Sequence, residues 1–95
     1  MLGEKLRELR EAKGLVQRQV AAELQVDTAY ISKMENSEKP ISRLHLKKLS
    51  KIYTVNEADL LSLWLADKIL QVIEDEKYAN EALMIVQNRI STKKE

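Results

Sequence analysis

The chain has 95 residues, of which 44% are hydrophobic and 33% are charged, a composition typical of one small soluble domain. It contains no cysteine and one histidine, which excludes disulfides, thiolate metal sites and catalytic sites built from several histidines. No apolar run approaches the about 20 residues of a membrane span, and the first residues lack the apolar stretch of a signal peptide. We therefore expect a cytoplasmic protein that is not an enzyme and uses no cofactor.

Basic and acidic side chains are unevenly divided along the chain. Residues 1–56 contain eleven lysines and arginines against seven acids, a net charge of +4. Residues 57–95 contain five against eight, a net charge of −3, which gives the +1 of the whole chain. This division indicates a first part that faces a polyanion, although an ordinary solvated surface explains the charge alone equally well.

Apolar residues recur at steps of three and four throughout, so the sequence predicts an all-α protein. The first helix is expected over residues 3–13 and is followed by Gly14 in a left-handed conformation. A second helix begins near Gln17, and a third, capped by Asp27, covers residues 28–36.

Ser42 and Asn56 are expected to cap a fourth and a fifth helix, the latter over residues 57–74. The fourth helix turns Leu46, Leu49 and Tyr53 toward the core, with Ile52 at the edge of that face and the lone histidine, His45, partly exposed beside it.

The fifth helix carries more apolar surface than one core can cover. Seven of its side chains span an arc of roughly 200°, about twice the width that a helix on one core needs. Leu60 and Trp64 fall outside this arc and are expected to be exposed. A sixth helix with its own apolar stripe follows, and residues 91–95 are expected to form a polar, frayed tail. The arc contains Leu61, Leu63, Leu65, Ile69, Leu70, Val72 and Ile73, and the stripe contains Tyr78, Ala79, Ala82, Leu83, Val86 and Ile90.

Residues 14–35, GLVQRQVAAELQVDTAYISKME, predict a short helix, a tight turn and a second short helix. This segment and its flanking positions resemble the Xre/Cro-type helix-turn-helix regulators over about residues 2–60. The flanking positions that match are Leu6, Leu9, Asn36, Pro40, Leu46 and Leu49.

The resemblance implies a five-helix, lambda repressor-like domain, here with an extended fifth helix and a C-terminal sixth helix. We expect a DNA-binding domain over residues 1–60, a helical extension for dimerisation over residues 61–90 and a polar tail over residues 91–95.

The resemblance also implies roles for individual residues. Side chains on the outward face of the third helix would contact base edges in the major groove. A second set would hold phosphates, and Arg10 and Glu35 would form a buried structural ion pair. The base-reading set is Thr28, Ala29, Ser32 and Lys33, and the phosphate set is Gln17, Arg18, Asn36, Lys39 and Arg43.

Three positions depart from the family's pattern. Val16 cannot cap the second helix with a side-chain oxygen, where the family offers Thr, Ser or Asn. Gln25 and Ser37 stand where the family commonly has glycine, so we expect either a changed turn or, at Gln25, a strained positive φ.

We expect a sequence-specific, homodimeric transcriptional regulator that binds a palindromic operator in double-stranded DNA, similar to restriction–modification controllers. The partner's fifth or sixth helix would contact Leu65, Ile69, Val72 and Ile73, unless the sixth helix folds back over the fifth within one chain. The alternatives are an antitoxin of a toxin–antitoxin pair and a protein-binding module that does not read DNA. The apolar fifth helix, on which Leu60 and Trp64 are expected to be exposed, favours the module.

Overall fold

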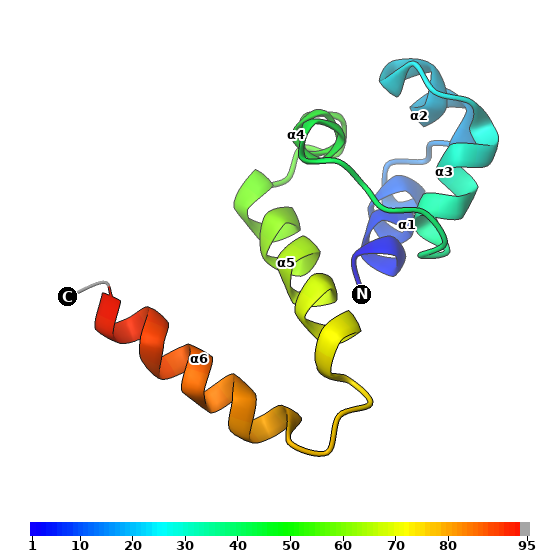
Figure 1. Cartoon of the computed structure of the whole chain (residues 1–95). Coiled ribbons are helices and arrows are strands. Elements are labelled where there is room, and N and C mark those ends of the chain that lie inside the picture. The colour runs from blue at the N-terminus through cyan, green and yellow to red at the C-terminus, as the bar shows by residue number, and fades with distance from the viewer. Residues whose placement is uncertain (94–95) are drawn as a thin grey trace.

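The computed structural model describes residues 1–93, which fold into six helices and, within that range, no strand (Figure 1). The helices are α1 (Leu2–Ala12), α2 (Gln17–Leu24), α3 (Thr28–Glu35), α4 (Arg43–Ile52), α5 (Glu57–Ile73) and α6 (Ala79–Lys93). This result confirms the all-α prediction, with helix ends that differ from expectation by about one residue. None of these helices has the length and hydrophobicity needed to cross a membrane.

Helices α1 to α5 surround one hydrophobic core. Helix α3 packs against α1 and α2, while α4 packs against α2 and α5. Ala21 is buried where α2 meets α3, because a small side chain allows the two helices to approach closely. The other buried apolar residues are Leu2, Leu6, Val20, Leu24, Ile31, Met34, Ile41, Leu46, Leu49, Tyr53 and Leu60.

The three predicted N-caps are present. The side chain of Asp27 accepts a hydrogen bond from the Tyr30 amide at 3.0 Å, and Ser42 accepts one from the His45 amide at 3.1 Å. Asn56 accepts one from the Ala58 amide at 3.0 Å. Each bond satisfies an amide that the helix itself leaves unpaired, which fixes where α3, α4 and α5 begin.

The departures from the family pattern leave the turns intact but strained. Gln25 adopts φ +59° and Ser37 φ +63°, both in the left-handed region that glycine occupies without penalty. Val16 provides no capping oxygen, yet the Gln19 side chain accepts a hydrogen bond from the Val16 amide at 2.9 Å. The start of α2 thus keeps one half of a capping box.

The expectation that Leu60 and Trp64 are exposed is wrong. Leu60 is 1% exposed and belongs to the core, and Trp64 is half-buried against it. The Trp64 indole donates a hydrogen bond to the Ile41 carbonyl at 2.6 Å. The helical projection misplaced these two residues because the apolar C-terminal half of α5, which extends beyond the core, dominated it.

Helix α6 runs away from α5, at the end of the molecule opposite α2 and α3 (Figure 1). None of its described side chains is buried. The helix continues through Ser91 to Lys93, so the expectation of a frayed tail from residue 91 is wrong for these residues. The expected tail also includes residues 94–95, which lie outside the described part of the chain.

Gly3 allows α1 to touch the end of α3. A Cβ atom added to Gly3 would lie 2.6 Å from the Glu35 carbonyl oxygen and 2.9 Å from the Met34 carbonyl oxygen. Such distances to backbone atoms require one of the two helices to move. Glycine is therefore needed for the contact between α1 and α3.

We expect Gly3→Ala to destabilise the fold by about 1–3 kcal/mol, although alanine is otherwise the better helix former. Urea unfolding of the variant measures this change. Lys5→Ala, on the exposed face of the same helix, is the control and should leave the free energy of unfolding within about 0.5 kcal/mol of the original. A Gly3→Ala protein as stable as this control would contradict the close approach.

Candidate nucleic-acid interface

The outward face of α3 combines small and polar side chains. Thr28, Ala29 and Lys33 are exposed, and Ser32 is half-buried. All four lie on one helix whose first turn is held by the Asp27 cap. The structure therefore brings the predicted base-reading residues together on one accessible surface, narrow enough for a major groove about 12 Å wide.

The opposite side of α3 ends in a buried carboxylate. The Glu35 side chain is 0% exposed and accepts hydrogen bonds from Arg10 Nε at 2.8 Å and Arg10 Nη2 at 3.1 Å. Gln17 Nε2 donates a third at 3.1 Å, and Arg10 Nη1 also donates to the Leu15 carbonyl at 2.9 Å. One carboxylate thus connects α3 to α1 and to the first residue of α2.

The surrounding cations keep Glu35 ionised. Burial by itself raises the pKa of the Glu35 carboxyl. The hydrogen bonds from Arg10 and Gln17, and the positive charges of Arg10 and Arg7, outweigh burial and leave the pKa below its ordinary value. A pair of this kind holds its geometry firmly because losing one partner leaves a buried charge uncompensated.

Two of the expected phosphate ligands are engaged within the protein. The Gln17 amide faces Glu35, so it supports α3 from behind. Asn36 is exposed, and its side-chain oxygen accepts a hydrogen bond from Arg7. Arg7 was not predicted to take part in the site. Its position three residues before Arg10, on the same face of α1, was the sequence pattern that could have indicated that both arginines lie near Glu35.

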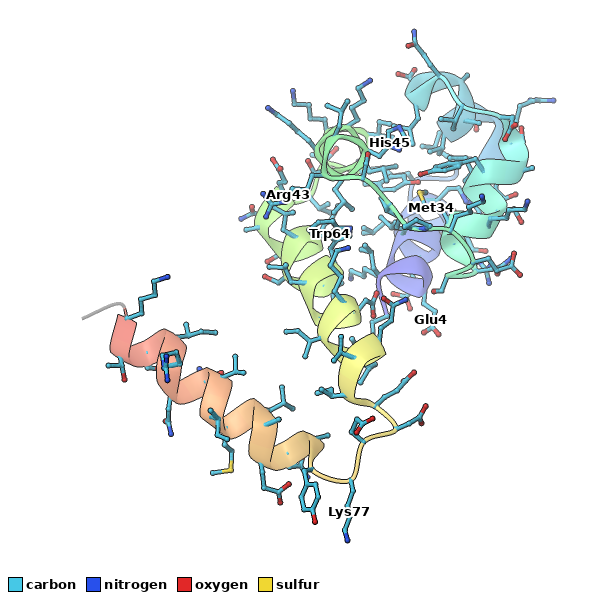
Figure 2. All side chains as sticks on the ribbon, viewed as in Figure 1. Glu4, Met34, Arg43, His45, Trp64 and Lys77 are labelled. Atoms are coloured by element: carbon cyan, nitrogen blue, oxygen red, sulfur yellow. The ribbon has the colours of Figure 1, made fainter. Side chains whose placement is uncertain are left out.

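Arg43 is placed by an aromatic contact that sequence reasoning missed. Its guanidinium carbon lies 5.4 Å from the centre of the Trp64 ring, where α4 begins beside α5 (Figure 2). Lys68 Nζ lies 4.4 Å from the same ring. Trp64 therefore holds Arg43 through a cation–π interaction. Arg18 and Lys39, the other predicted phosphate ligands, are exposed.

Tyr30 and His45 connect α3 to α4, another contact that the sequence did not reveal. Their rings meet edge to face with centroids 5.6 Å apart, and the Tyr30 hydroxyl lies 3.3 Å from His45 Nδ1. The same hydroxyl donates to the Pro40 carbonyl at 3.2 Å. The start of α3 and the loop after it are thereby fixed relative to α4.

Comparison with known proteins identifies the family. The family model described as Helix-turn-helix matches residues 6–60, more than half of the chain. The chain therefore belongs to the Xre/Cro-type helix-turn-helix family, which consists of DNA-binding regulators. No curated protein and no solved structure gives a significant match to the chain.

Removing Arg10 should destabilise the domain far more than removing an exposed arginine. We expect Arg10→Met to lower the free energy of unfolding by about 3–5 kcal/mol, because it leaves the Glu35 carboxylate buried without its main partner. Arg18→Met is the matched control and should melt within a few degrees of the original protein. Thermal unfolding followed by circular dichroism compares the two, and equal melting temperatures would rule out the proposed role of the pair.

The lowered pKa of Glu35 also predicts how stability depends on pH. Because the carboxyl binds protons less tightly in the folded state, its contribution is fully present above the unfolded pKa of about 4.3 and is lost as pH falls through the folded value. The stability difference between the original protein and Glu35→Gln should therefore shrink as pH falls from about 6 to about 2. Urea unfolding at each pH measures it, and a difference that stays constant would contradict the assignment.

Proposed function

We propose that this chain is a homodimeric transcriptional regulator that recognises a specific sequence in double-stranded DNA by placing α3 in the major groove. The observation that carries the proposal is the outward face of α3, small and polar, on a helix fixed from behind by the buried Glu35 network. Such a face can approach base edges without distorting the domain behind it.

On that face, individual side chains suit particular base contacts. Lys33 can donate hydrogen bonds to guanine O6 and N7, and the Thr28 methyl and Ala29 can touch a thymine methyl group. Ser32, which is half-buried, is the weaker candidate for a base contact. These assignments follow the positions that the family resemblance implies, and the exposure of Thr28, Ala29 and Lys33 supports them.

The phosphate contacts would come from the elements that flank α3. Arg43, held against Trp64, and the exposed Lys39 lie on either side of the α4 start, and Arg18 lies in the first turn of α2. Asn36 and Gln17 complete the proposed set, with Gln17 acting mainly on the orientation of α3. Contacts of this kind fix the position of the protein on DNA without reading its sequence.

Dimerisation would raise specific affinity, because one small reading unit buries little DNA surface. Leu65 and Ile69 are each 46% exposed on α5, and Val72 is 74% exposed, while Ile73 is half-buried. A two-fold axis through this face would present two α3 helices to half-sites about 34–36 Å apart in a palindromic operator. Control of a restriction–modification system and action as an antitoxin both remain predictions from the sequence.

The protein-binding alternative loses part of the feature that favoured it. Leu60 is buried in the core, and Trp64 is engaged with Ile41 and Arg43. Neither side chain is free to receive a protein partner in this structure, and the exposed stripe of α5 that remains is the surface proposed here for the dimer. DNA recognition is therefore the function that the interface supports best.

A binding titration separates the two proposed kinds of contact. Duplexes selected by the full chain from a random pool supply the specific site, and a scrambled duplex is the reference. Lys33→Ala should lose about 1–3 kcal/mol of discrimination at one base pair. Arg43→Ala should weaken binding to both duplexes alike and reduce the salt slope by about 1.

Lys77→Ala, on the linker far from α3, is the control and should leave both affinities and the salt slope unchanged (Figure 2). If Lys33→Ala lowers both affinities equally, its base-reading role is wrong. If selection by the full chain enriches no sequence, the proposed function is wrong.

A further inference from the structure

Helix α6 is fully formed, yet the rest of the described chain does not pack over its side chains. Its described side chains include no buried one, and large apolar residues face solvent all around it. An isolated helix of this length is marginal in water, so it needs a packing partner. The exposed apolar side chains are Leu83, Met84, Ile85, Val86 and Ile90, with Tyr78 just before the helix.

The second half of α5 likewise carries apolar side chains that nothing in the described chain covers. Leu65, Ile69 and Val72 follow one another at steps of four and three, so they form one stripe along the helix. Each is at least 46% exposed. The stripe lies C-terminal to Leu60 and Trp64, which pack in or against the core.

Within one chain the two uncovered stripes lie apart. Residues 74–78 form turns in which the Glu76 amide donates to the Ile73 carbonyl at 3.0 Å and the Ala79 amide donates to the Glu76 carbonyl at 3.3 Å. These bonds lie in the connection between α5 and α6, and the two helices diverge (Figure 1). The alternative in which the sixth helix folds back over the fifth is therefore not what the structure adopts.

We propose that α6 of each copy packs on the α5 stripe of a second copy, so that the two chains exchange their C-terminal helices. This inference rests on the proposed homodimer and names the surface that forms it. By two-fold symmetry the same contact occurs twice, and α5 and α6 of both copies form a four-helix bundle.

The spacing of the two stripes supports an antiparallel contact. Read forward, α5 presents Leu65, Ile69 and Val72 at steps of four and three. Read backward, α6 presents Ile90, Val86 and Leu83 at the same steps. Each α5 residue therefore meets one α6 residue in register, with Ile69 opposite the central Val86.

At the start of α5, charge agrees with the same direction of packing, whereas at the other end of the contact the register sets Glu74 opposite Glu81. Glu57 and Asp59 lie in the first turn of α5, and Lys93 lies in the last turn of α6 with Arg89 one turn earlier. An antiparallel contact places the basic end of α6 toward the acidic end of α5. It also brings helix ends of opposite partial charge together.

The exposed apolar area is large enough for a stable dimer. Ten large apolar side chains of α5, the linker and α6 are exposed. At on the order of 100 Å² each, they expose on the order of 1,000 Å² per copy, compared with about 800 Å² per partner in a standard interface. Both contacts of the bundle draw on this area, because each copy contributes its α5 stripe to one contact and its α6 to the other.

Engineered cysteines test the exchange, because the chain has none of its own. Ile69→Cys in one copy and Val86→Cys in a second, longer tagged copy are mixed by refolding and oxidised without DNA. We expect a disulfide between the two different chains. Met84→Cys, about 200° around α6 from Val86, replaces Val86→Cys in the control and should give at least about tenfold less cross-linked product.

A chain carrying both Ile69→Cys and Val86→Cys distinguishes exchange from fold-back. Exchange predicts a covalent dimer, whereas a disulfide within one chain would overturn the proposal. Sedimentation gives a second readout: Val86→Asp should weaken the dimer at least about tenfold and Met84→Asp less than about twofold, with helicity checked by circular dichroism. A full-length protein that sediments as a monomer at tens of micromolar would also overturn it, whatever the duplex titrations give.

Discussion

The arrangement of the DNA-binding half depends on one buried carboxylate, that of Glu35. It lies at the end of α3 and accepts hydrogen bonds from Arg10 on α1 and Gln17 at the start of α2. A buried charge is costly unless it is paired, so these three elements are stable only in the orientation that brings the donors together. The contact at Gly3 adds to this constraint, because it brings the backbone of α1 against the backbone carbonyl of Glu35.

This constraint explains how a short helix can serve as a reading surface. Helix α3 has eight residues, too few to be stable in isolation, and its inward side chains Ile31, Met34 and Glu35 are all buried. The outward side chains take no part in this buried packing and are available to contact DNA. Tyr30 against His45 and Trp64 against Arg43 extend the fixed framework to α4 and α5. Arg43, one of the proposed phosphate contacts, therefore lies on this framework.

The sequence predicts the parts of this fold that are governed by local chemistry. The caps at Asp27, Ser42 and Asn56 and the core face of α4 follow from residue type and helical spacing, and all are present. The position of Trp64 could not be predicted in this way, because a projection of α5 weights all apolar residues equally while the core ends partway along the helix. The tertiary contacts of Arg7 and Tyr30 involve partners 29 and 15 residues away, which periodicity does not register.

We infer that Arg10 and Glu35 act as one unit that orients α3. A double-mutant cycle of Arg10→Met and Glu35→Gln, measured by urea unfolding at pH 7, tests this claim. If the pair acts as a unit, the double variant should be more stable than the two separate losses predict when added, with a coupling free energy of about 2–3 kcal/mol. Losses that add to within about 0.5 kcal/mol would contradict the claim.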